Sequence, residues 1–232
     1  MADDAFQHSR LLHLWADGAE FRLTRCRRTQ TGYFNFCQSL LSMSLEAARQ
    51  HCRGRFPPAA GIPLHLQGMM HLVLSHRRRV HLNRICQEAA VERYRAENPN
   101  GRVALVEPPA PQEQEAGRLN LAQTFELFEG TRLIGASNET AGVVNGVFLT
   151  VGQVRNEDCD VTDEFGNCFS LTFAAIARSA RLAHAITVTS SQSREFDCPV
   201  VIWDLDSPRY TRKYLYVAMT RVRRPEVLVV VG

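Results

Sequence analysis

Apolar residues form three short runs near the end of the chain, and polar segments separate them. The runs cover residues 185–188, 199–205 and 227–231. Runs of this length with polar residues on both sides indicate buried strands. Residues 209–223, between the last two runs, have the apolar spacing of a helix. Strands that alternate with helices predict a parallel sheet with covered faces, and therefore an α/β fold.

The first hundred residues show the same alternation of patterns. Residues 30–50 and 75–97 have the apolar spacing of helices, and residues 71–74 form an apolar run typical of a buried strand. A short amphipathic helix is predicted within residues 1–20. Residues 54–63 are rich in proline and glycine and predict a loop.

The middle of the chain has shorter apolar runs and more turn residues. Residues 102–107 and 129–134 each predict a strand, and Asn145-Gly146 between apolar residues is typical of a hairpin turn. Short strand patterns with polar turns continue from 147 to 173. This part of the chain is therefore predicted to be rich in β-structure.

The β-rich part also contains residue types that bind metals, but their spacing differs from that of known metal sites. The acidic turns at 155–158 and 163–166 do not match the twelve-residue calcium loop. Cys159 and Cys168 are further apart than the usual zinc-binding pair, so zinc remains only an alternative for them. We predict no metal site in this chain.

Composition narrows the class of protein. Hydrophobic residues make up 45% of the 232 residues and charged residues 22%, as in globular domains. The seven cysteines form no C-x-x-C pair, which favours reduced thiols. No apolar run reaches the length of a membrane helix, and the first residues do not resemble a signal peptide. We expect an intracellular protein (nuclear, cytoplasmic or viral) that is not secreted and contacts no membrane.

Positive charge is unevenly distributed and is carried almost entirely by arginine. The first hundred residues contain 14 arginines and 8 acidic residues, which suits a polyanionic partner. Lys213 is the only lysine of the chain, and no glycine-rich G-x-x-x-x-G-K-[ST] loop precedes it. The chain therefore has no P-loop with which to bind a nucleotide by itself.

Two segments near the end of the chain resemble motifs of superfamily I helicases. Residues 185–197 read A-I-T-V-T-S-S-Q-S-R-E-F-D, and residues 216–223 read Y-V-A-M-T-R-V-R. They are similar to the helicase motifs A-I-T-V-H-K-S-Q-G-x-E-F-D and Y-V-A-L-S/T-R-V/A-R in order and spacing. Residues 23–29 partly match a third motif, L-x-x-N-Y-R-S/T, and residues around Asn145-Gly146 resemble a fourth.

The resemblance, which covers about residues 21–230, implies the second RecA-like motor domain of a superfamily I DNA helicase. It is nearest to the Pif-like, Dda-like and RecD-like branch, which carries a small insertion, and shares the UvrD-like C-terminal motifs. The implied fold is a RecA-like parallel sheet flanked by helices, with a small β-rich, SH3-like insertion. The implied division places the first part of the RecA-like domain at 1–146, the insertion at 147–180 and the closing part at 181–232.

The resemblance also assigns contacts to a nucleotide. Arg221 and Arg28 match arginines that approach the γ-phosphate and are the candidate catalytic residues. Gln192 and Glu195 match residues near the nucleotide. The implied cofactors are ATP and Mg²⁺, shared with an N-terminal P-loop motor domain that is absent from this chain. Two alternatives remain: Arg28 is a plain surface arginine, and Arg221 is an ion-pair partner of Asp204 or Asp206.

A second set of residues is predicted to contact single-stranded DNA. Arginines at a helix N-terminus suit a phosphate group, although a solvated charge run is an alternative for them. Thr189 and Ser193 replace a histidine and a glycine of the helicase motif. The missing glycine matters if the loop needs a positive φ. The predicted DNA contacts are Ser75, His76, Arg77, Asn83, Thr187, Thr189 and Ser191.

Two functions from different classes fit these patterns. One is the C-terminal half of an ATP-dependent DNA helicase, which supplies arginines to a shared ATP cleft and a surface for single-stranded DNA. The alternative is a non-catalytic nucleic-acid-binding or regulatory module derived from such a half.

Overall fold

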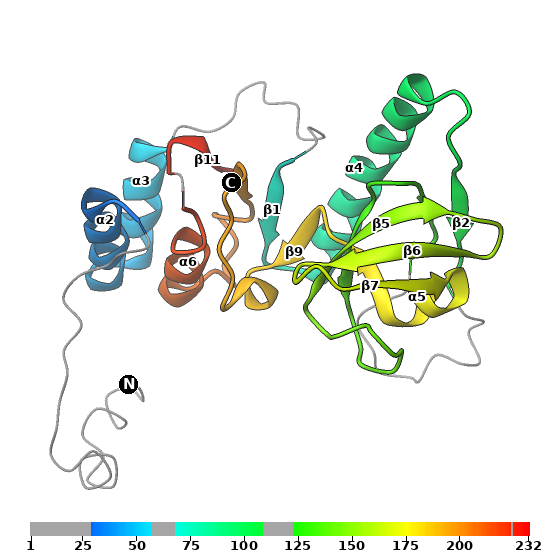
Figure 1. Cartoon of the computed structure of the whole chain (residues 1–232). Helices are drawn as coiled ribbons and strands as arrows, with labels where there is room; N and C mark the ends of the chain where they lie inside the picture. Colours follow the sequence, from blue (N-terminus) through cyan, green and yellow to red (C-terminus); the bar gives the residue numbers. More distant parts are fainter. Residues whose placement is uncertain (1–28, 57–67, 109–122, 224) are drawn as a thin grey trace, which may run out of the picture.

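A four-stranded parallel sheet forms the centre of the fold (Figure 1). The computed structural model describes residues 29–56, 68–108, 123–223 and 225–232. The strands run in the order β11-β10-β1-β9, and every pairing is parallel. All their residues are buried, as expected when helices cover both faces. The strands are β1 (Met70–Val73), β9 (Ala185–Thr187), β10 (Val200–Ile202) and β11 (Leu228–Val230).

Helices pack on both faces of this sheet (Figure 1). Alternate strand residues such as Leu72 and Ile186 join the core that includes α2, α3 and α6. Their neighbours Val73 and Ala185 face the other way and pack with Leu82 of α4. The predicted α/β fold with a RecA-like parallel sheet is confirmed. The helices are α2 (Thr31–Ser42), α3 (Leu45–Arg55), α4 (His76–Glu97) and α6 (Arg212–Met219).

Two predicted helix boundaries were wrong. Residues 30–50 form two helices rather than one, because the Ser44 hydroxyl accepts a hydrogen bond from the Ala47 N–H and caps α3. The helix predicted over 209–223 is shorter, since Thr211 caps α6 in the same way through the Tyr214 N–H. Residues 1–28, including the predicted N-terminal helix, lie outside the described residues.

A five-stranded antiparallel sheet forms a second unit, with its own core (Figure 1). It extends beyond residues 147–180 on both sides, so the domain boundaries at 146 and 180 stay a prediction. A two-stranded sheet of β2 (Ala104–Val106) and β3 (Phe125–Leu127) lies beside it. In sheet order the five strands are β7 (Cys168–Thr172), β6 (Asp158–Asp163), β5 (Phe148–Val154), β4 (Arg132–Gly135) and β8 (Ala180–Leu182), and α5 (Phe173–Ser179) connects β7 to β8.

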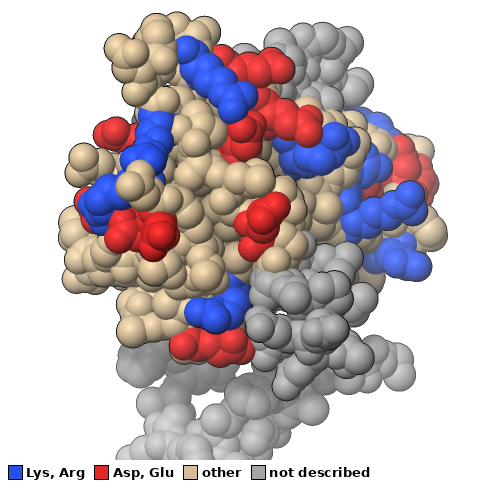
Figure 2. All heavy atoms as spheres, turned by 90° about the vertical axis from the view of Figure 1, so that its right-hand side faces the viewer, with Lys and Arg blue, Asp and Glu red and all other residues tan. Residues whose placement is uncertain are grey.

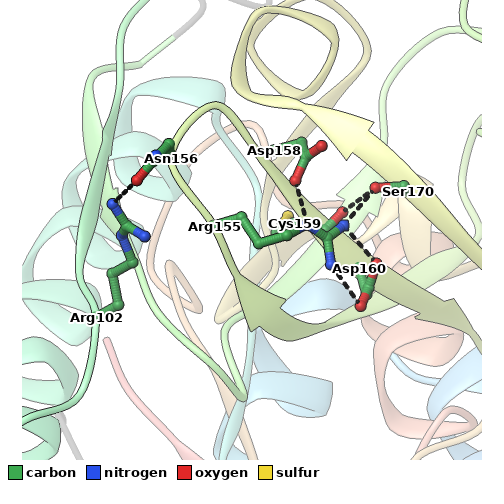
Figure 3. Close-up of polar contacts among 7 residues, drawn as sticks. All are labelled: Arg102, Arg155, Asn156, Asp158, Cys159, Asp160 and Ser170. Atoms are coloured by element: carbon green, nitrogen blue, oxygen red, sulfur yellow. Dashed lines mark hydrogen bonds and ion pairs between the residues drawn. The ribbon is translucent and has the colours of Figure 1, made fainter.

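Exposed polar contacts tie three strands of this unit together (Figure 3). Arg155 follows β5 and forms ion pairs with Asp158 and Asp160 of β6, and it also donates to the Ser170 hydroxyl of β7 at 2.7 Å. On the face of the molecule that this unit forms, arginine and carboxylate side chains are interspersed (Figure 2). Arg155 therefore belongs to the structure of the unit and not to a binding site.

Candidate nucleotide and nucleic-acid sites

The two helicase-like motifs lie next to each other and are paired through their backbones. The Phe196 N–H donates to the Arg221 carbonyl at 2.8 Å, and the Arg223 N–H donates back to the Phe196 carbonyl at 3.2 Å. This pair of backbone bonds joins the loop after β9 to the segment after α6. The side chains of the two motifs are therefore held in a fixed relation to one another.

Three hydrogen bonds orient the half-buried guanidinium of Arg221. Its Nε donates to the Val217 carbonyl at 3.1 Å, and its Nη1 donates to the Arg194 carbonyl at 3.0 Å. Its Nη2 donates to the Thr220 hydroxyl at 3.0 Å. These three bonds hold the planar guanidinium fork of Arg221 in one orientation.

Asp204 and Asp206, the two carboxylates considered as alternative partners of Arg221, pair with other arginines. Asp204 pairs instead with Arg78, with 3.1 Å between its Oδ1 and the arginine Nε. Asp206 pairs with Arg53 of α3. Both carboxylates are thus engaged by arginines of other helices.

Arg221 lines a pocket of about 150 Å³ that three separate segments build. Glu195 enters from the loop after β9, and Tyr33 and Phe34 enter from α2. Thr29, just before α2, also lines the pocket, and its buried hydroxyl oxygen has no hydrogen-bond partner among the described residues. We name this the Arg221 pocket; its lining residues are Thr29, Tyr33, Phe34, Cys37, Glu195, Tyr216, Thr220, Arg221, Val222 and Arg223.

Of the residues predicted to contact a nucleotide, Glu195 lies in the Arg221 pocket and Gln192 lies outside it. Glu195 lines the Arg221 pocket and forms an ion pair with Arg223, at 3.2 Å between Oε2 and Nε. Gln192 does not line this pocket; it is exposed and lines a larger cleft of about 760 Å³. Arg28 lies outside the described residues. Sequence reasoning missed Thr29 as a site residue, although it directly follows Arg28 in the motif.

The larger cleft lies between the loop after β9 and the antiparallel sheet. Gln192 and Arg194 line it from the loop, and Phe148 and Glu164 line it from the sheet. Arg194 forms an ion pair with Glu164 at 2.9 Å, and its guanidinium carbon lies 4.4 Å from the centre of the Phe148 ring. Glu195 lines this cleft as well, so the loop after β9 borders both the cleft and the Arg221 pocket.

The loop after β9 takes a backbone conformation that usually requires glycine. It begins with a single 3-10 turn, η2 (Thr189–Ser191), and Ser193 then has φ of 64°. A serine in this left-handed region costs roughly 1–2 kcal/mol, which glycine avoids. The helicase motif has glycine at this position, and the chain keeps the turn without it.

Some of the predicted DNA contacts are accessible. Ser75 caps α4 by accepting a hydrogen bond from the Arg78 N–H, and His76 and Arg77 follow it as exposed residues of the first turn. Thr189 is exposed on η2. These four residues stay candidates for contact with a nucleic-acid backbone.

Three other predicted DNA contacts are buried, and their polar groups form hydrogen bonds inside the fold. Asn83 is 0% exposed; its Nδ2 donates to the Ala185 carbonyl at 3.0 Å, and its Oδ1 accepts from the Ala185 N–H at 2.7 Å. Ser191 is also fully buried and donates to the Val188 carbonyl at 2.7 Å. The Thr187 hydroxyl is buried and accepts from the Ser190 N–H at 3.2 Å.

Asn83 belongs to a buried polar network between α4 and the sheet. We name this network the α4 seam; it comprises Asn83 and Gln87 of α4 with Ala185, His184 and His71. His184 Nε2 lies 2.7 Å from Gln87 Oε1, which can only accept, so the imidazole donates. Gln87 then donates through Nε2 to the Glu126 carbonyl at 2.7 Å. Sequence reasoning missed this network.

Both histidines of the α4 seam are held neutral. Burial lowers the pKa of His71 to about 4. Its Nδ1 accepts from the Trp203 indole N–H at 3.1 Å, so protonation there would place two donors against each other. Burial, followed by the nearby His71 and Arg132, lowers the pKa of His184 to about 4.

Two kinds of feature are lacking in the part of the chain that the structure describes. No cluster of three or more His, Cys, Asp or Glu side chains there is arranged to hold a metal ion. No helix in these ranges has the length and apolar character needed to cross a membrane.

Solved structures of helicases share the fold described above, with its parallel sheet flanked by helices. Among solved structures, the chain is similar to Bacteroides Pif1 bound to single-stranded DNA, with a TM-score of 0.56 and 16% identity. It is also similar to Bacteroides Pif1 in complex with ADP-AlF3 and single-stranded DNA (TM-score 0.53, 16% identity) and to Pif1 helicase from Candida albicans (TM-score 0.53, 16% identity).

These alignments cover 90% of this chain but only 51–55% of the Pif1 chains. The chain thus spans about half the length of the helicases that it matches. At this identity the likeness confirms the fold predicted from the motifs. No model of a protein family matches the sequence, and no curated protein sequence does.

Proposed function

We propose that this chain is the second motor half of an ATP-dependent superfamily I DNA helicase. Its role is to close an ATP cleft, whose other wall is a P-loop domain, and to hold single-stranded DNA. The observation that carries the proposal is the Arg221 pocket, where an oriented arginine, a carboxylate and an unpartnered hydroxyl converge from three segments.

The polar groups of this pocket fit the phosphate end of a nucleotide. The buried Thr29 hydroxyl lacks a partner in the part of the chain that the structure describes, and burying a hydroxyl without one costs roughly 1–3 kcal/mol. A phosphate oxygen accepts from such a hydroxyl and from a guanidinium fork. Arg28 directly precedes Thr29 in the sequence, and we assign it as the second arginine that contacts the γ-phosphate.

The pocket supplies only part of what nucleotide hydrolysis needs. Bound ATP supplies the phosphoryl group, and a catalytic arginine stabilises the charge that develops there. No metal-ligating cluster occurs among the described residues, so Mg²⁺ is assigned to the P-loop partner. Glu195, held by Arg223 at the rim, is suited to orient the nucleotide from the opposite side of the pocket.

Single-stranded DNA is the proposed second ligand. Two of the Pif1 structures that resemble this fold are complexes with single-stranded DNA. On this chain the accessible candidates are Ser75, His76 and Arg77 at the start of α4 and Thr189 on η2. The loop that carries Thr189 also carries Glu195, so closure of the ATP cleft is transmitted directly to the DNA-facing turn.

The test is reconstitution of ATP turnover. The chain is combined with a P-loop motor domain, in cis or in trans, and phosphate release is measured with and without an oligonucleotide. Arg221→Ala is expected to lower kcat by about 10³-fold or more, as for other catalytic arginines. Arg209→Ala, which removes an exposed arginine just before α6, is the matched control and is expected to leave kcat unchanged.

Two results would decide against the proposal. ATP turnover by the chain alone would show that the P-loop partner is unnecessary. Full turnover by the reconstituted Arg221→Ala pair would remove the catalytic role of this arginine. If the pair binds an oligonucleotide but never turns over ATP, the non-catalytic nucleic-acid-binding module becomes the better description.

A further inference from the structure

The side chain of Arg194 connects the loop after β9 to the antiparallel unit. It is 18% exposed and forms a two-armed ion pair with Glu164, which follows β6. The distances are 2.9 Å from Nη1 to Oε2 and 3.2 Å from Nη2 to Oε1. Nη2 also donates to the Gly146 carbonyl, and the guanidinium carbon lies 4.4 Å from the centre of the Phe148 ring. Three residues of the antiparallel unit and its connections therefore hold this side chain.

The backbone of Arg194 contacts the Arg221 pocket. Its carbonyl accepts the hydrogen bond from Arg221 Nη1 at 3.0 Å. The other two acceptors described above, Val217 and Thr220, belong to α6 and its C-terminal end. Of these three bonds, the one to Arg194 ties the guanidinium to a different segment of the chain. A shift of the loop would release Nη1 and leave the other two bonds in place.

The turn before Arg194 needs support from the surrounding structure. Ser193 has φ of 64°, which is unfavourable for serine, whereas the glycine of the helicase motif adopts it without that cost. Strained backbone persists only where its surroundings determine the conformation. The side-chain contacts of Arg194, one residue further on, provide such support. A serine in place of glycine thus makes the loop depend on the antiparallel unit.

We propose that Arg194 is a positioning residue for Arg221. The antiparallel unit binds the side chain of Arg194, and the carbonyl of Arg194 in turn fixes the guanidinium of Arg221. This role rests on the proposed function of Arg221 in ATP turnover, where a displacement of about 1 Å can cost a factor of about 10² in rate. It involves a position at which the helicase motif has no fixed residue. It also gives the antiparallel unit a part in hydrolysis, although none of its strand residues lines the Arg221 pocket.

The first measurement is the NMR signal of the Arg221 guanidinium in the full chain, without nucleotide or partner. The Nε–H and Nη–H signals are assigned by their loss in Arg221→Lys. Because hydrogen bonds hinder rotation of the guanidinium group, separate Nη–H signals are expected in the unmodified chain. Arg194→Ala and Glu164→Ala are each expected to broaden or merge these signals, since the loop carbonyl is no longer held in place.

The second measurement is ATP turnover by the chain combined with a P-loop motor domain. Arg194→Ala is expected to lower kcat about 10- to 100-fold and to change KM for ATP much less. Glu164→Ala is expected to act in the same direction with a smaller effect. Arg194→Lys keeps the charge but loses the fork, so its kcat is expected to lie between those of Arg194→Ala and the unmodified chain. Arg84→Ala, which breaks an exposed ion pair with Glu88 on α4, is the matched control and is expected to change neither measurement.

A double variant distinguishes positioning of Arg221 from a general loss of structure. If Arg194 acts through Arg221, Arg194→Ala is expected to cause no further loss of kcat in an Arg221→Ala background, because coupled residues are not additive. A second full loss of kcat in that background would mean that Arg194 acts by another route, and it would overturn the proposal.

The outcomes also separate this role from the proposed function. Changed Arg221 signals together with a lower kcat support both. Unchanged signals in Arg194→Ala and Glu164→Ala, or a normal kcat in Arg194→Ala while Arg221→Ala is inactive, overturn the role of Arg194 and leave the proposed function intact. Changed signals with full turnover by Arg221→Ala keep the link between the antiparallel unit and Arg221 but reject the proposed function.

Discussion

The α4 seam and the Arg221 pocket both gather polar side chains at the parallel sheet, but they use them in opposite ways. In the seam, Asn83 binds both backbone groups of Ala185, and Gln87 joins His184 to the Glu126 carbonyl. In the pocket, the hydroxyl of Thr29 has no partner among the residues that the structure describes.

The difference separates structural polar groups from functional ones. Polar groups that satisfy one another stabilise a fold and leave nothing for a ligand, whereas a buried group without a partner is explained by a ligand. By this criterion the residues of the seam hold α4 to β9. The Arg221 pocket, with its unpartnered hydroxyl, is the place where we propose an external group.

The largest expected effect is a loss of stability in acid, and it tests the seam. The folded-state pKa of His71 and of His184 is about 4, below the unfolded value of about 6.5. Between these values the unfolded chain binds more protons, so the free energy of unfolding falls as pH decreases. The loss is about 3 kcal/mol for each histidine by pH 4.

Urea unfolding at several pH values measures this loss. His184→Gln keeps a donor for Gln87 and is expected to remove about half of the pH dependence. His81→Gln changes an exposed histidine of the same helix region and serves as the control. An unchanged pH profile in His184→Gln would mean that the seam does not hold this histidine neutral.

The next effect is the loss of the amide that bridges α4 and β9. Asn83→Ala removes two hydrogen bonds and leaves the Ala185 backbone groups unsatisfied, so the free energy of unfolding is expected to fall by about 2–4 kcal/mol. Affinity for an oligonucleotide, measured on the folded variant, is expected to stay unchanged. Asn100→Ala, in the exposed turn after α4, is the control. Weaker DNA binding with normal stability would reverse the assignment of Asn83.

A smaller effect on stability is expected in the loop after β9, which borders both the Arg221 pocket and the larger cleft. Ser193→Gly relieves the left-handed conformation at φ of 64° and is expected to add about 1 kcal/mol of stability. For a chain of this size that corresponds to a rise of about 2–4 °C in melting temperature. Ser193→Ala keeps the strain and is expected to give no gain. Equal melting temperatures for both variants would argue against this strain.

The smallest effect on stability is expected in the Arg221 pocket. Thr29→Val removes the unpartnered hydroxyl with little change in shape, so no loss of stability is expected. ATP turnover by the reconstituted pair is nevertheless expected to fall, because the hydroxyl is assigned to a phosphate oxygen. Thr31→Val, at the exposed start of α2, is the control. A clear loss of stability in Thr29→Val would make this residue part of the fold and not of the site.

The sequence predicted the parallel sheet well, because its strands are buried on both faces. The apolar runs at 71–74, 185–188, 199–205 and 227–231 overlap β1, β9, β10 and β11, since continuous burial leaves a continuous apolar pattern. The break between α2 and α3 was missed. A serine such as Ser44 is compatible with a helix interior and with an N-cap, and only the surrounding packing decides between them.

The candidate sites were predicted only in part. The resemblance to helicase motifs assigned Arg221 and Glu195 to the same nucleotide, and both line the Arg221 pocket. Asn83 and Ser191 were assigned to DNA because their polarity is visible in the sequence, whereas their internal partners are not. Ala185, the partner of Asn83, is about a hundred residues away and contributes only its backbone, which leaves no trace in a pattern of side chains.

The strand order of the parallel sheet means that β1 is synthesised long before the two strands that pair with it. β1 lies between β9 and β10, yet about a hundred residues separate it from either neighbour. At roughly 5–20 residues per second, a ribosome needs about 5–20 seconds to make that stretch. The antiparallel unit is complete by then, while the apolar β1 still waits for partners. The nascent chain therefore exposes an unpaired edge during this interval, and chaperone binding is most useful there.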